Sequence, residues 1–207
     1  MEQNFSYLAG LLSAGLGFAA YFPYIRDMLR GETQPERASW LVWTGMASLS
    51  LVAQAHEGAT LSLFFAMAQA VATGSIAILA IRYGVGGWTR SADRWIVLAA
   101  ALGMYLWTLT DSAVYALAIS IGVSMLGGSV TLTKAYAHPD SETLTTWLLS
   151  ALAAGFAMIA VGQWSAILLA YPVYMFTLNT SIAMAILLGR RARSRTVPIS
   201  TDVTQTW

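Results

Sequence analysis

The chain of 207 residues contains no cysteine and only two histidines, His56 and His138. It therefore has no disulfide and no thiolate ligand for a metal ion, and two imidazoles are too few to build a metal centre on. Charged residues make up only 10% of the sequence, against about 25% in a soluble domain. Hydrophobic residues make up 57%. This composition predicts an all-α integral membrane protein with no metal and no other cofactor.

The hydrophobic residues gather in seven runs. A helix that crosses a hydrocarbon core of about 30 Å needs roughly 20 apolar residues, and the runs have about that length. Their bounds are 5–24, 39–55, 60–81, 95–110, 112–133, 145–161 and 165–188, and none contains Asp, Glu, Lys, Arg or His. A secretory signal peptide needs a positive n-region, but no Lys or Arg precedes the first run. We therefore expect seven retained transmembrane helices.

The cations indicate how these helices are oriented. All eleven Lys and Arg residues lie between runs 1 and 2, 3 and 4, or 5 and 6, or after run 7, and the alternate loops contain none. Cytoplasmic loops of membrane proteins carry an excess of such residues. We expect the N-terminus outside, the C-terminus in the cytoplasm and a multi-pass location in the plasma (inner) membrane. The net charge of +1 gives no reason to expect a nucleic-acid partner.

Two charged segments, 23–40 and 131–147, resemble each other. In both, an apolar run ends in a cation, a short loop carries a proline and acidic residues, and a Ser-Trp or Thr-Trp pair opens the next run. The tryptophans of these pairs, Trp40 and Trp147, are 107 positions apart. Because both segments follow a helix that starts outside, the similarity predicts a duplicated chain with parallel repeats related by an axis along the membrane normal.

The duplication divides the chain into four parts. We expect a first three-helix repeat over 1–83, a linker helix with its preceding cytoplasmic loop over 84–110, and a second three-helix repeat over 111–189. The remaining residues, 190–207, begin with four arginines in six positions and end in a polar stretch. We expect this tail to lie at the cytoplasmic surface, basic first and then disordered.

A three-one-three array of parallel repeats, with a proline near the cytoplasmic end of its first helix and a charged loop after it, resembles the SWEET and PQ-loop superfamily of seven-helix small-solute transporters. Pro23 matches the proline that lets the family's first helix bend during gating, although Tyr24 stands where the family usually has glutamine. The second repeat offers Gly127 and Gly128 in place of a proline. The resemblance implies alternating access around a central site between the repeats.

Polar side chains in the third helix of each repeat are the candidates for that site. Asn179 resembles one of two asparagines that contact substrate in the sugar-carrying members, and Thr73 stands at the position of the other. Gln69 lies four residues before Thr73 and shares its helix face. Polar groups at this depth usually face the protein interior or a wet cavity. The alternative for all three is hydrogen bonding between helices, worth about 0.6 kcal/mol per contact in a membrane.

Tryptophans near the cytoplasmic ends of the second helices have two interpretations. An aromatic ring can stack on a solute, but tryptophan also anchors helices at the membrane interface. We expect anchoring for Trp40 and Trp147. Trp43 is nearly one turn deeper and Ser48 is further in, and we expect these two to line the pocket.

Five residues are candidates for gating, and the loops around them are charged. They are Pro23, Tyr24, Gly127, Gly128 and Pro172, which removes a backbone hydrogen bond in the outer part of the last helix. Close helix packing is the alternative for the glycines. The charged residues of the two loops could form an ion-pair network at an inner gate, but we expect solvated loops instead.

Proton-coupled carriers generally use a carboxylate or histidine within the membrane, and the apolar runs have none. We therefore expect a uniporter of a small neutral polar solute such as a sugar, with the lipid bilayer and the solute as partners and a homo-oligomer compatible with the chain. A proton-linked amino-acid or metabolite carrier that uses a loop carboxylate stays open. So does a receptor or assembly protein of the same fold that transports nothing. No catalytic constellation can be assembled within the runs, so we do not expect an enzyme.

Overall fold

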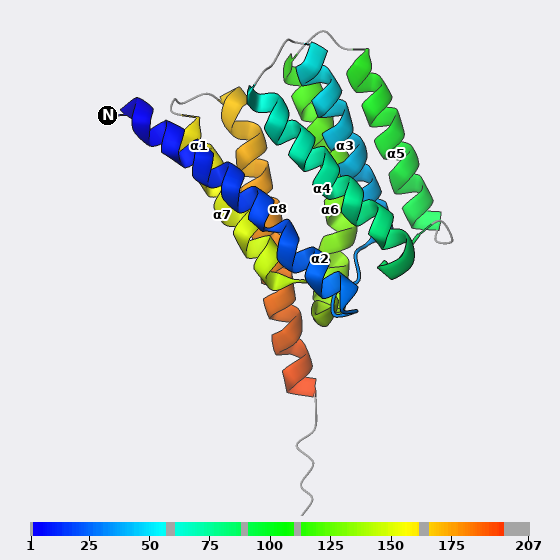
Figure 1. Ribbon diagram of the computed structural model, residues 1–207. Coiled ribbons are helices and arrows are strands. Elements are labelled where there is room, and N and C mark those ends of the chain that lie inside the picture. Colours follow the sequence, from blue (N-terminus) through cyan, green and yellow to red (C-terminus); the bar gives the residue numbers. More distant parts are fainter. Residues whose placement is uncertain (1, 57–60, 88–90, 110–112, 162–165, 197–207) are drawn as a thin grey trace, which may run out of the picture.

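A computed structural model describes residues 2–56, 61–87, 91–109, 113–161 and 166–196, and over these ranges the chain is mostly helical (Figure 1). The helices are α1 (Glu2–Ala19), α2 (Tyr21–Leu29), α3 (Arg37–His56), α4 (Leu61–Tyr83), α5 (Ser91–Thr108), α6 (Ala113–Ala137), α7 (Leu144–Ala160) and α8 (Ala166–Thr196), with a 3-10 turn, η1 (Pro139–Ser141), before α7. The predicted all-α class is confirmed. Each of the seven apolar runs falls on one helix, except that the first is divided between α1 and α2.

The division between α1 and α2 lies where proline weakens the helix. Pro23 has no N–H, so the carbonyl of Ala19 receives no hydrogen bond from it. The helix is interrupted at Ala20 and resumes at Tyr21. It ends at Leu29, where Gly31 adopts a φ of 75° and donates its N–H to the carbonyl of Met28.

Four helices extend beyond the predicted runs by four residues or more. The first continues to Leu29 instead of residue 24, α6 to Ala137 instead of 133 and α8 to Thr196 instead of 188, and α5 begins at Ser91 instead of 95. The prediction counted apolar residues and so ended each helix before its first charge, although charged residues outside a bilayer are good helix formers. α8 continues through the four arginines, past residue 189 where we expected the second repeat to end. Residues 197–207, where we expected disorder, lie outside the described residues.

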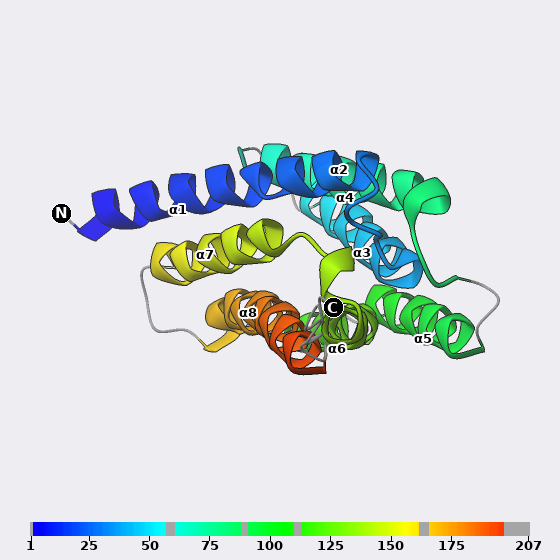
Figure 2. The ribbon, with the colours of Figure 1, turned by 90° about the horizontal axis from the view of Figure 1, so that it is seen from below.

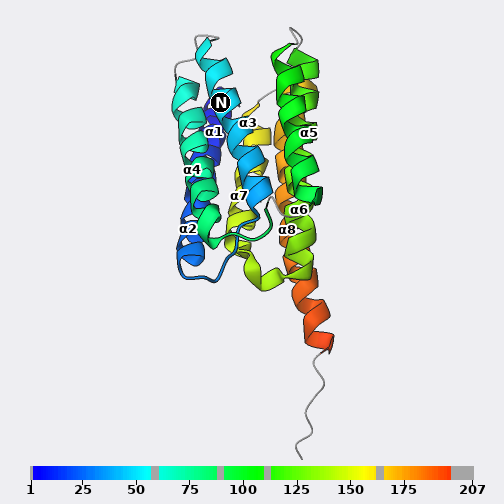
Figure 3. The ribbon, with the colours of Figure 1, turned by 90° about the vertical axis from the view of Figure 1, so that its right-hand side faces the viewer.

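The helices form a ring with one helix outside it (Figure 2). Around the ring, α1 packs on α7, α7 on α8, α8 on α6, α6 on α3 and α3 on α4, and α4 meets α1 and α2. The outside helix, α5, packs on α6 and α3. We call α1–α4 the first half and α6–α8 the second half. Segments 30–36, 84–87 and 138–143 and the end of α8 all lie at one end, which we call the loop-side end (Figures 1 and 3).

The hydrophobic core is built by both halves. Its largest buried members are Tyr24, Met28, Ile76, Ile182 and Ile186, together with Trp40 and Trp147. In contrast, many apolar side chains of α1 and α5 are exposed, including Phe5, Leu8, Leu98 and Leu102. Two described helical segments are long and apolar enough to cross a membrane, Phe5–Leu29 and Leu169–Arg195.

Two glycines let the loops pack against the ends of α4 and α8. A methyl group at Gly84 would collide with the carbonyl oxygens of Ala80 and Pro35, and one at Gly189 with the carbonyl of Tyr136 and the ring of Pro139. Gly84 and Gly189 are 105 positions apart. Each half therefore brings the proline of its loop against the end of its own last helix in the same way.

The close packing at Gly189 predicts a loss of stability on substitution. Gly189→Ala should lower the free energy of unfolding by about 1–3 kcal/mol, because the added methyl must displace backbone. Gly122→Ala in α6 is the control: its added methyl meets nothing within 4 Å, so it should be neutral or gain up to about 1 kcal/mol. Chemical unfolding of the detergent-solubilised variants measures both. Equal effects of the two substitutions would contradict the packing described for Gly189.

Candidate functional site

Reciprocal hydrogen bonds join the two halves at the loop-side end. Ser39, at the start of α3, donates to the carbonyl of Gly127 in α6 over 2.6 Å, and Thr146, at the start of α7, donates to the carbonyl of Ala20 over 3.0 Å. The donors are 146 − 39 = 107 positions apart, and the acceptors are 127 − 20 = 107 apart. Each half thus gives a buried hydroxyl to the first helix of the other half. Thr131 adds a hydrogen bond to Ser39 Oγ over 2.8 Å.

An aromatic cluster lies beside these hydroxyls. Tyr24 is buried at its centre, with ring centroids 5.0 Å from Trp40 and 6.2 Å from Trp147, and its hydroxyl accepts a hydrogen bond from Trp40 Nε1 at 3.1 Å. Trp43 packs edge-on against both tryptophans, at 5.2 and 6.1 Å. Because Trp40 and Trp147 are each only 4% exposed, the prediction that they are interface anchors is wrong. They fill the space between the halves.

A buried ion pair completes this layer. Lys134 Nζ lies 2.6 Å from Glu142 Oε1, and the other carboxylate oxygen accepts Trp147 Nε1 at 3.0 Å. Lys134 also donates to the carbonyl of Gln34 in the first half. Burial raises the pKa of Glu142, while Lys134 and the hydrogen bonds of Lys134 and Trp147 act to lower it. The expectation of solvated loops is therefore wrong for Lys134 and Glu142.

Two acidic residues of the first half, Glu36 and Asp27, lie where the two halves meet. Glu36 is buried and its carboxylate accepts the N–H of Ser39 at 3.0 Å, which caps the start of α3, and the same carboxylate oxygen lies 3.3 Å from the Ser39 hydroxyl oxygen. Asp27 accepts the hydroxyl of Thr143 at 3.0 Å, and that hydroxyl lies 2.5 Å from the hydroxyl of Thr33. We call the hydroxyls, the aromatic cluster and these charged residues together the loop-side seal.

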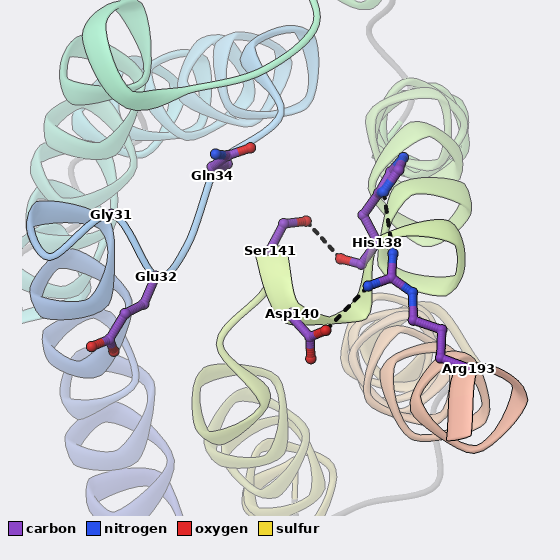
Figure 4. Close-up of a pocket in the computed structure, with 7 residues that line it drawn as sticks. All are labelled: Gly31, Glu32, Gln34, His138, Asp140, Ser141 and Arg193. Carbon is purple, nitrogen blue, oxygen red and sulfur yellow. Dashed lines mark hydrogen bonds and ion pairs between the residues drawn. The ribbon is translucent and has the colours of Figure 1, made fainter. Parts of the chain in front are cut away.

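Outside the seal, a pocket of about 260 Å³ lies between the loop of residues 30–36 and the loop of residues 138–143. Figure 4 shows Glu32 and Gln34 on one side, His138 and Asp140 on the other, and Arg193 reaching from α8. Arg193 donates to the Asp140 carboxylate at 3.2 Å and to the carbonyl of Ala137 at 2.8 Å. Acidic and basic groups both line the pocket, and in the part of the chain that the structure describes no three His, Cys, Asp or Glu residues are placed to hold a metal.

The predicted solute-binding residues lie deeper, on several helices. Asn179 is 3% exposed and donates to the carbonyl of Met175 on its own helix at 2.7 Å, and Thr73 is likewise buried and bonded to its own helix. Gln69 donates to the hydroxyl of Tyr21 at 2.6 Å. Ser48 is exposed on α3. The Thr73 hydroxyl donates to the carbonyl of Gln69, one turn earlier on α4, and among the described residues no other side-chain hydrogen bond joins two of these four residues.

Two polar residues near Trp43, namely Ser124 and Tyr174, were not predicted from the sequence. Tyr174 donates to Ser124 Oγ at 2.9 Å, and the carbonyl of Ser124 accepts Trp43 Nε1 at 3.4 Å. Tyr174 lies 105 positions after Gln69, so the two residues occupy equivalent positions in the repeats. Each bonds to the first part of its own half: Gln69 to Tyr21 in α2 and Tyr174 to Ser124 in α6. The repeat offset could have found Tyr174, but only once Gln69 was known to bond to Tyr21.

The candidate gating residues differ in their surroundings. Pro23 and Tyr24 lie in α2 just after the interruption, whereas Pro172 lies inside α8 and the helix continues through it. α6 also continues through its glycine pair: a methyl group at Gly127 would lie 3.3 Å from Ser39 Cα and from Trp43 Nε1, and one at Gly128 would lie 2.7 Å from a methyl carbon of Leu178. The glycines thus permit close approach of α3 and α8.

Comparison of the chain with family models, with curated proteins and with solved structures gave no match.

The ion pair predicts strong coupling between its two members. Lys134→Met or Glu142→Gln alone should cost about 3–5 kcal/mol of unfolding free energy, because each leaves a buried charge without its partner. The double variant should lose less than either single variant. Chemical unfolding in detergent measures the cycle, and losses that simply add would show that the pair is not coupled. Arg26→Gln, which breaks the exposed pair with Asp27, is the control and should change stability by less than about 1 kcal/mol.

Proposed function

We propose that the chain is a seven-span membrane carrier of a small neutral polar solute, such as a sugar, and that its two three-helix halves move against each other to give alternating access. The observation that carries the proposal is the reciprocal pair of hydrogen bonds from Ser39 to Gly127 and from Thr146 to Ala20. The three supporting arguments concern the surface, the arrangement of the helices and the position of the contacts between the halves.

The surface supports a location in the bilayer. Large apolar side chains are exposed on most of the helices, for example Leu11, Val71, Leu102 and Met184. Soluble monomers rarely expose continuous apolar surface of this kind. The described ion pairs, in contrast, all involve residues of the loop-side end, where the sequence places the cytoplasm.

The helix neighbours support two equivalent halves. If α1 and α2 are exchanged with α6, α3 with α7, and α4 with α8, every contact of the ring is replaced by another contact of the ring. A pseudo-two-fold axis through the centre of the ring has this effect, and α5 is then the linker helix outside it. Carriers built from parallel repeats bind their solute near such an axis.

The contacts between the halves support a carrier with its loop-side end closed. All described side-chain hydrogen bonds that link the two halves join residues 20–43 to residues 124–146. Five of these seven bonds are neutral and contribute about 1 kcal/mol each, and the bonds of Lys134 and Asp27 contribute about 1.5–3 kcal/mol each, so the seal can open at moderate cost. When it opens, the pocket between the loops becomes the cytoplasmic mouth of the pathway.

The polar residues beyond the seal support a neutral solute. Asn179, Thr73, Gln69, Ser124 and Tyr174 supply amides and hydroxyls and no charge. Such groups hydrogen-bond to hydroxyls of a sugar-like solute, and the edge of Trp43 borders the same region.

The buried carboxylates favour a second candidate, the proton-linked carrier. Glu142 has a raised pKa in the closed seal, above its ordinary value of 4.5, because it is buried. Opening the seal admits water and lowers this pKa, so a proton that Glu142 takes up in exchange for its pairing with Lys134 is released to the cytoplasm when the seal opens.

Counterflow uptake in proteoliposomes tests the proposal, with labelled neutral sugars, amino acids and nucleosides as solutes. One solute class should exchange, and Asn179→Ala should slow its exchange about tenfold or more, which corresponds to about 1.4 kcal/mol. Thr177→Ala is the matched control: Thr177 is exposed on the same helix and bonds only to its own backbone, so exchange should be unchanged.

Two outcomes would change the conclusion. Folded protein that exchanges no solute of any class contradicts the carrier. Uptake that rises steeply with an imposed pH gradient, and loses that dependence in Glu142→Gln, contradicts the uniporter and selects the proton-linked carrier.

A further inference from the structure

An apolar groove of about 350 Å³ lies between α3, α4 and α5, away from the seal. Its inner lining includes the small residues Ala38, Gly74 and Ala77. Leu41, Ile78 and Ile81 border it and are 40%, 69% and 74% exposed, so the groove opens sideways at the outer surface of the helices. A groove that faces the bilayer and is lined by small apolar residues fits an extended hydrocarbon chain.

Arg37 places a permanent positive charge at the loop-side end of this groove. It is the first residue of α3, and its guanidinium donates to the carbonyls of Ala80 and Gly86 at 2.9 and 2.6 Å and to Ile81 at 3.2 Å. Those contacts use three of the five N–H groups of the guanidinium. Of the carboxylates whose side chains the structure describes, none lies within ion-pair distance of Arg37.

The second half lacks this combination. The position equivalent to Arg37, at 37 + 107 = 144, is Leu144, the first residue of α7. Among the described helices, none packs on α7 as the linker helix α5 packs on α3. Within the described part of the chain, the charge and the groove therefore occur together in the first half alone. A packing role shared by both repeats does not account for that difference.

We infer that this groove binds an anionic phospholipid of the cytoplasmic leaflet, with one acyl chain in the groove and the phosphate at Arg37. The inference rests on the proposed location in the membrane. Arginine suits the site because its planar guanidinium gives phosphate two parallel hydrogen bonds and cannot lose its charge. The groove runs along α3 from Arg37 to Thr44, seven residues later. Each helical residue rises about 1.5 Å, so this length is about 10 Å.

Native mass spectrometry of the full chain, delipidated and then titrated with phosphatidylglycerol or phosphatidylcholine, tests the site. Wild type should bind the first phosphatidylglycerol about tenfold more tightly than phosphatidylcholine. Arg37→Gln should abolish that preference. Ala77→Phe, which fills the groove and leaves the charge, should weaken binding of both lipids. Arg82→Gln removes an exposed cation next to Ile81 and should change nothing.

Several results would overturn the site. Equal affinity of wild type for the two lipids, retention of the preference in Arg37→Gln, or the same loss in Arg82→Gln would each do so. Arg37 also holds the end of α4, so Arg37→Lys is included: it keeps the charge and should keep part of the preference. Counterflow measured on the same variants separates this inference from the proposed function, because exchange that persists when no lipid preference exists overturns only the lipid site.

Discussion

The buried contact between Lys134 and Glu142 sets the conditions for the rest of the loop-side end. Moving two charges out of water costs several kcal/mol per ion, and their attraction offsets this only if the remaining donors and acceptors are also satisfied. The partners come from both halves: Trp147 and the carbonyl of Ser141 from the second, and the carbonyl of Gln34 from the first. The loop of one half must therefore lie against the other before the charges can be buried. This favours a seal that is closed or open as a unit.

Most of the other contacts between the two halves are neutral; Asp27, which accepts the hydroxyl of Thr143, is the exception among the described ones. Hydroxyl-to-carbonyl bonds such as those of Ser39 and Thr146 hold the halves in register, yet each contributes little net free energy. The aromatic rings of Tyr24 and its neighbouring tryptophans exclude water from the pair. In a carrier these properties belong together, because the end that closes must be tight enough to block the solute and weak enough to open.

Much of the fold could be predicted from the sequence, and little of the seal. Hydropathy located the helices, because seven runs without charge are long and well separated. The similarity of the two charged segments predicted the duplication, but we expected their loops to be solvated and not to meet. Asn179 and Thr73 were predicted to face the protein interior or a wet cavity. Both are buried, and each side chain bonds to its own helix. Hydropathy could not show that Trp40 and Trp147 face inward, because a tryptophan at the end of a helix has the same hydropathy whether it lies at a lipid interface or in a protein core. It also could not show that Lys134 and Glu142 are buried, because their burial depends on a loop from the other half.

The most direct test is a disulfide across the seal. The chain has no cysteine, so Thr33→Cys/Thr143→Cys carries only the introduced pair, at positions whose hydroxyls lie 2.5 Å apart in the two halves. We expect oxidation to stop solute counterflow in proteoliposomes and reduction to restore it, with both single-cysteine variants unaffected. Full exchange in protein shown to be cross-linked would contradict the account, because a seal that cannot open would then not block transport.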